Sequence, residues 1–148
     1  MTRVFVSEGT GAAVYVFSND HCPPHVSARH RGEEWIARVR FSYLRDTVQL
    51  WSIEPHRHAP AQRVINRLLE EVHGQLPACR RSWWHTQHTL CLENQWVLQA
   101  ADGSIQPLEE RIAEAKQIAQ AVYLQEPGAE RLWLQFSDGT ITEVRVTP

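Results

Sequence analysis

The first half of the chain places apolar and polar residues alternately in short runs, a pattern typical of antiparallel strands. Residues 4–6 and 13–17 flank a glycine-rich turn and predict an opening hairpin. Residues 26–41 predict a second hairpin, and residues 47–53 predict one more strand. We therefore expect an antiparallel sheet at the start of the chain.

The second hairpin closes at Gly32-Glu33, where a glycine in the first central position suits a type II′ turn. This turn sets the register, so alternate residues share a face. One face is apolar apart from one histidine and holds Val26, Ala28, His30, Trp35, Ala37 and Val39. The opposite face is rich in arginine and holds Arg29, Ile36, Arg38 and Arg40.

Helical periodicity replaces alternation after Pro60, and the amphipathic stripe ends at Gly74. Pro77 is expected to open a second, shorter helix that carries Trp83 and Trp84. These segments predict one or two helices packed on the sheet.

The last third contains two Asp-Gly turns, at Asp102 and Asp138, each between segments that read as strands. Between them Pro107 is expected to open a helix, because apolar residues follow it at helical spacing. This stripe comprises Leu108, Ile112, Ala115, Ile118 and Val122.

These elements predict an α+β protein. Residues 1–90 form an antiparallel N-terminal sheet with one or two helices. Residues 91–148 form a smaller β-α-β-β portion, which either extends the same sheet or forms a lobe of its own.

Composition supports a folded domain without a membrane segment. Hydrophobic residues make up 43% of the 148 residues and charged residues 22%, which are values typical of globular proteins. No apolar run approaches the roughly 20 residues that span a bilayer, and the first residues do not resemble a secretory leader. We expect a cytoplasmic protein that does not insert into membranes.

The net charge of −2 conceals an asymmetry between the two parts of the chain. Up to Leu90 there are eleven arginines and eight acidic residues, whereas from Cys91 onward there are four basic and nine acidic residues. Such asymmetry indicates either an anion-facing half or two halves that attract each other.

Two strands, a helix and a tryptophan follow the loop of residues 19–28, which is centred on Pro23-Pro24-His25. In these features residues 3–88 resemble the bacterial family called domain of unknown function 4160. The family pattern is Pro-Pro-His-x-His-Ala, and Ser27 stands at the second histidine. Residues 132–146 are similar to domain of unknown function 2442, which is often encoded beside the first family. The resemblance implies a bacterial protein and a toxin-antitoxin-like setting.

The histidines of this segment are the candidate catalytic residues. Imidazole titrates near neutral pH, so two histidines could serve as general base and general acid in phosphodiester cleavage without a metal. The candidates are His21, His25 and His30, with Arg29, Arg38 or Arg40 to hold a phosphate oxygen. The alternative is a structural histidine, because the register places His30 on the same face as Trp35.

The arginine face could bind nucleic acid, but a solvated, salt-bridged sheet face is favoured because lysine is absent from this half. His56 and His58 could join His21 and His25 at a metal, yet no established metal-binding motif is present. We expect neither a metal nor a cofactor.

The preferred interpretation is a non-enzymatic interaction protein, toxin-antitoxin-like, whose protein partner covers the acidic C-terminal portion. The alternative is a small RNA-cleaving or phosphate-handling enzyme that uses the candidate histidines and arginines. The six tryptophans predict a large core, with a homodimer interface as the alternative.

Overall fold

A computed structural model describes residues 1–126 and 128–146. The chain divides into two compact units. The first comprises Met1–Ser42 and Asp46–His88, and the second comprises Tyr43–Arg45 and Thr89–Pro148. The division after residue 88 lies close to the expected one after residue 90, but the assignment of Tyr43–Arg45 to the second unit was not foreseen.

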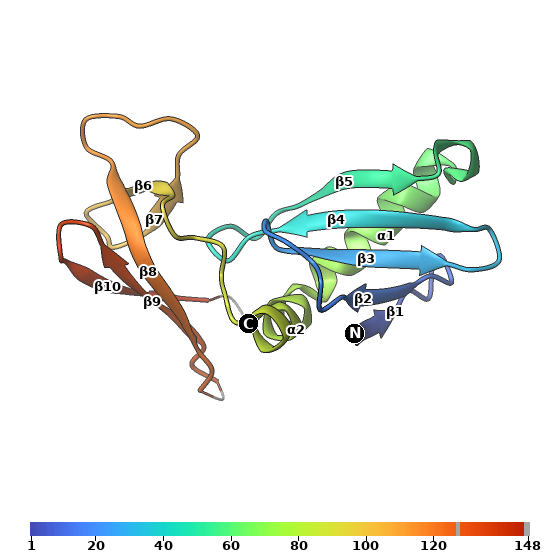
Figure 1. Cartoon of the computed structure of the whole chain (residues 1–148), viewed down its shortest axis with the longest axis horizontal. Helices are drawn as coiled ribbons and strands as arrows, with labels where there is room; N and C mark the ends of the chain where they lie inside the picture. Colours follow the sequence, from blue (N-terminus) through green and yellow to red (C-terminus); the bar gives the residue numbers. More distant parts are fainter. Residues whose placement is uncertain (127, 147–148) are drawn as a thin grey trace. The chain divides into compact units, whose positions relative to one another are not determined.

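The first unit is built on an antiparallel sheet, which we call the N-terminal sheet (Figure 1). Its strands are neighbours in space in the same order as in sequence. They are β1 (Thr2–Val6), β2 (Ala13–Val16), β3 (His25–His30), β4 (Trp35–Phe41) and β5 (Val48–Glu54). The predicted strands of the first half are thereby confirmed.

A short 3-10 helix, η1 (His56–His58), and two α-helices follow the sheet. The helix α1 (Gln62–Gly74) contacts β5, and α2 (Leu76–Gln87) contacts β1, β2 and β3. Both helices were predicted, and Pro77 lies in the first turn of α2. Neither helix of the described residues has the length and apolar character that crossing a membrane requires.

The core of the first unit lies between the helices and one face of the sheet. Burial alternates along β4, where Trp35, Ala37, Val39 and Phe41 are buried and the residues between them are partly exposed. The other core residues come from the neighbouring strands and the helices and include Val14, Val16, Val26, Ala28, Ile65, Leu68, Val72, Leu76, Cys79 and Trp83. Figure 1 shows α1 behind the strands, so the sheet face turned toward the reader is the one opposite the core.

The hairpin of β3 and β4 has the predicted register, since Val26 pairs with Val39 and His30 with Trp35. The predicted type II′ turn is wrong. That turn requires a positive φ at its first central residue, whereas the positive φ of this loop, 57°, falls on Glu34. Side-chain capping provides the reason, because the backbone N–H of Glu33 donates to Nδ1 of His30 over 2.9 Å. Register therefore followed from the hydrophobic pattern and not from the turn type.

The second unit contains an antiparallel sheet with the strand order β10-β9-β8-β6-β7. Its strands are β6 (Trp96–Gln99), β7 (Ile105–Pro107), β8 (Lys116–Leu124), β9 (Arg131–Phe136) and β10 (Ile141–Arg145). The α+β class is confirmed for the whole chain, and the helices lie in the first unit.

The helix predicted after Pro107 is wrong, because residues 116–124 form β8. This strand pairs with both β6 and β9, and a bulge falls between Ile118 and Gln120. The bulge shifts the alternation, so Ile118, Ala121 and Tyr123 are buried, whereas Val122, a member of the predicted helical stripe, is 37% exposed. Hydrogen bonding to two neighbouring strands outweighs the local preference of the Ala- and Gln-rich segment for a helix.

Both predicted Asp-Gly hairpins are confirmed and share one local geometry. Gly103 and Gly139 each have a φ of 88°. Oδ1 of Asp102 accepts the backbone N–H of Ser104 and the Ser104 hydroxyl over 2.9 and 2.7 Å. Asp138 accepts the equivalent groups of Thr140 over 2.9 and 2.6 Å.

These bonds predict a pH dependence of the hairpins. The hydroxyl of Ser104, followed by its backbone N–H, lowers the pKa of Asp102 below 3.8, and the same groups of Thr140 lower that of Asp138. A lowered folded pKa means that the stabilisation is complete above pH 3.8 and is lost as the pH falls through the folded pKa.

Carboxyl-carbon NMR titration is expected to give midpoints below 3.8 for both aspartates. Ser104→Ala should raise the midpoint of Asp102 and leave that of Asp138 in place. Equal midpoints in the wild type and the variant would contradict this account.

Candidate functional site

The strongest candidate site is the face of the N-terminal sheet opposite the helices, which we call the open face. Directly paired residues form a row across it: Arg3 pairs with Tyr15, Tyr15 with Ser27, Ser27 with Arg38, and Arg38 with Ser52. Directly paired side chains on one sheet face are about 5 Å apart. The row therefore crosses the sheet from β1 to β5.

The predicted anion-binding arginines lie together on this open face. Arg38 and Arg40 alternate along β4, and Arg29 lies on β3 opposite Ile36. Arg38 Nη1 lies 3.4 Å from Glu54 Oε2, and Arg40 Nη2 donates to Gln49 Oε1 over 2.7 Å. Arg29 is exposed, and Arg38 and Arg40 are partly exposed.

Aromatic side chains lie on this face and in the neighbouring bulge of β5, which the sequence analysis did not anticipate. Tyr15 and Phe17 are stacked with ring centroids 5.7 Å apart. Trp51 is 43% exposed and lies in a bulge of β5, opposite the step from Arg38 to Val39. Alternation along residues 13–17 could have revealed Tyr15. The bulge concealed Trp51, because an extra residue in the strand breaks the simple alternation.

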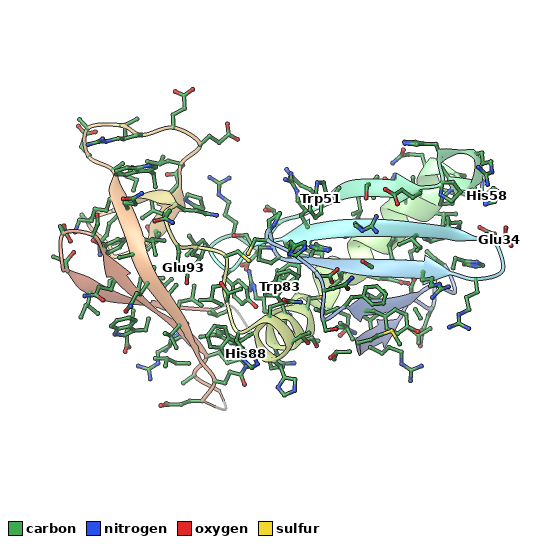
Figure 2. The ribbon with its side chains drawn as sticks, viewed as in Figure 1. Glu34, Trp51, His58, Trp83, His88 and Glu93 are labelled. Carbon is green, nitrogen blue, oxygen red and sulfur yellow. The ribbon has the colours of Figure 1, made fainter. Side chains whose placement is uncertain are left out.

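His25 is a buried residue at the start of β3, and its ring contacts Trp51 and Trp83 at centroid distances of 5.0 and 5.3 Å. Figure 2 labels both tryptophans. Nδ1 of His25 lies 2.9 Å from the carbonyl oxygen of Pro23, and Nε2 lies 3.4 Å from Oδ1 of Asp20. Asp20 also accepts the backbone N–H of Phe17 over 2.8 Å.

These contacts assign a structural role to the pair of His25 and Asp20. Nδ1 lies within hydrogen-bonding distance of the Pro23 carbonyl oxygen, and Nε2 faces the Asp20 carboxylate. Both nitrogens face protein atoms, and the ring is buried. The pair ties together the loop of residues 17–25 and presents no ring nitrogen to a substrate.

The structure does not bring the candidate histidines together. His25 and His30 lie at opposite ends of the six-residue strand β3 and, at an odd spacing, on opposite faces. His30 stacks on Trp35 at a centroid distance of 5.4 Å, as the structural alternative predicted. His21 is exposed in the loop before β3.

His56 and His58 lie in η1 after β5, and His58 contacts the loop between β3 and β4. His56 is exposed, and Nδ1 of His58 lies 3.0 Å from the backbone oxygen of Glu34, a neighbourhood that Figure 2 shows. Across residues 1–126 and 128–146, no three His, Cys, Asp or Glu side chains gather in an arrangement that could hold a metal ion.

A hollow of about 400 Å³ lies at the hairpin end of the sheet. Arg29, Ile36 and Glu54 contribute to it from the open face, and Arg31 and Glu34 contribute from the loop. Charges of both signs line this hollow, so it favours no simple anion.

Cys79 offers no reactive thiolate. Its side chain is fully buried in α2, and burial raises the pKa of the thiol to about 12. The thiol is therefore protonated at neutral pH and packs as a small apolar group.

Comparison with known proteins gives no match to a family model, to a curated protein or to a solved structure. The functional argument therefore depends on the geometry of the chain itself.

Proposed function

We propose that this protein is a non-enzymatic binding protein and that its partner binds the open face of the N-terminal sheet. The observation that carries the proposal is a sheet face that presents Arg29, Arg38 and Arg40, with Trp51, 43% exposed, in the bulge of the adjoining strand β5. Tryptophan and arginine are the residues most enriched at binding hot spots.

The geometry of the histidines supports binding over catalysis. A general base must reach the proton that it abstracts, whereas both nitrogens of His25 face Pro23 and Asp20. His30 lies at the other end of β3, so the two rings do not form an acid-base pair.

The resemblance of residues 3–88 and 132–146 to two families that are often encoded together supports a partner in the same cell. A toxin-antitoxin-like pair is the setting that fits this resemblance.

Quantitative capture from a lysate of the host cell tests the open face as the binding surface. The baits are tagged wild type, Trp51→Ala and Arg63→Ala. Arg63→Ala is the control, because Arg63 is exposed on α1 and lies outside the open face. We expect Trp51→Ala to retain about tenfold less of the bound partner, as for an interface hot spot. Arg63→Ala should capture as much as the wild type. Equal capture by all three baits would overturn the proposal.

A further inference from the structure

We propose that the partner of the open face is single-stranded RNA, an inference that depends on the proposed function and specifies its ligand. The juxtaposition that carries it is a stacked tyrosine-phenylalanine pair among arginines on the sheet face opposite the helices, with an exposed tryptophan in the bulge of β5. Exposed aromatic rings and guanidinium groups are the two side-chain types that single-stranded nucleic acids require.

The aromatic groups provide stacking surfaces for bases. Trp51 lies on β5, and the pair of Tyr15 and Phe17 lies on and just after β2. Three strand spacings of about 4.8 Å separate β2 from β5, so the stacking positions are roughly 14 Å apart. A sheet with aromatic residues at separate positions can stack two or three unpaired bases.

The arginines provide phosphate contacts between these stacking positions. Arg29, Arg38 and Arg40 lie on β3 and β4, the strands between β2 and β5, and Arg3 lies on β1 beside Tyr15. Within strands β1 to β5, all of which the structure describes, Glu54 is the one acidic residue on this face. The face is therefore positive, although the chain carries a net charge of −2. Charge complementarity thus favours an anionic ligand, and a single-stranded polyanion also supplies bases for the aromatic rings.

Aromatic stacking positions on a sheet favour single strands over duplexes. Duplex RNA is recognised by shape across its minor groove, whereas stacking on aromatic residues requires unpaired bases. The oxygens of Gln49 and Ser52 accept from Arg40 and Arg38, so the Gln49 amide NH₂ and the Ser52 hydroxyl proton are the groups that can be donated to a ribose 2′-hydroxyl, which DNA lacks. We therefore assign RNA as the ligand.

Fluorescence anisotropy with a labelled 12-nucleotide single-stranded RNA tests this inference. Trp51→Ala should weaken binding by about 5- to 150-fold through the loss of one stacked base, and Trp51→Phe should stay within about threefold of the wild type because it retains an aromatic face. Arg29→Ala with Arg40→Ala should reduce the slope of log K against log salt by about 1.4, since two phosphate contacts disappear. Arg63→Ala is the matched charge control and should change neither quantity beyond a general charge effect.

Further measurements distinguish single-stranded RNA from other nucleic acids as the ligand. Single-stranded DNA of the same sequence should bind more weakly than RNA, and duplex RNA should bind at least about tenfold more weakly, because its bases are already paired. Circular dichroism of each variant checks that the sheet is intact. Absence of RNA binding at low salt, equal weakening by Arg63→Ala, or equal affinity for duplex RNA would overturn the inference.

Lysate treated with nuclease distinguishes a failure of this inference from a failure of the proposed function. If the wild type captures a protein from treated lysate and Trp51→Ala does not, the open face binds a protein and the RNA inference fails alone. If the wild type binds neither RNA nor any component that Trp51→Ala loses, both proposals fail.

Discussion

Replacing Arg80 with alanine is expected to lower the free energy of unfolding of the first unit by about 3 kcal/mol. Arg80 is 1% exposed and lies on α2. Its Nε and Nη2 both donate to the carbonyl oxygen of Ser42, over 3.0 and 2.8 Å, and Nη2 also donates to Asp46 Oδ1 over 3.0 Å. Alanine removes these charge-assisted bonds and the packed side-chain stem together.

Asymmetry between the two ion-pair partners makes this prediction specific. The side chain of Asp46 is 50% exposed, so water can replace its contact, and Asp46→Asn should cost less than about 1 kcal/mol. Arg80→Lys should lie between the two variants, because an ammonium group cannot reproduce the planar fork on the Ser42 carbonyl. Urea unfolding measures all three against Arg63→Ala as a surface control. A change below about 1 kcal/mol in Arg80→Ala would show that Arg80 does not hold this segment.

Replacing Trp35 with alanine is expected to lower the free energy of unfolding by about 3 to 5 kcal/mol, the range for a buried tryptophan. Trp35 is 1% exposed, begins β4 on the core face and stacks on His30. Its indole Nε1 donates to Glu33 Oε2 over 2.9 Å. Truncation therefore removes apolar contacts and also releases the hairpin loop from the sheet.

Two further variants separate packing from hydrogen bonding at this position. Trp35→Phe keeps an aromatic ring and should cost about 1 to 2 kcal/mol, whereas Glu33→Gln keeps an acceptor and should cost less than about 0.5 kcal/mol. Urea unfolding followed by circular dichroism gives the differences. If Trp35→Ala and Trp35→Phe lose equal stability, the loss does not come from core volume, and the packing explanation is wrong.

The arginines of the candidate site could be predicted from sequence, but the position of Trp51 could not. Alternation along residues 26–41 places Arg29, Arg38 and Arg40 on one face, because side chains alternate in any strand. The position of Trp51 depends on a bulge, whose location is decided by pairing between β4 and β5. The separation of His25 from His30 required the boundaries of β3, which follow from its pairing with both neighbouring strands.

Local rules were sufficient where one segment decides its own conformation. The sequence by itself determined the register of the hairpin of β3 and β4, the helices α1 and α2, and the Asp-Gly turns, because alternation, an amphipathic stripe and a glycine with positive φ act over a few residues. Tertiary structure alone decided that residues 116–124 form a strand, that Glu34 takes the left-handed conformation, and that Arg80 is buried. Each of these depends on hydrogen-bond partners supplied by other segments, and backbone and guanidinium groups removed from water must find such partners wherever the fold provides them.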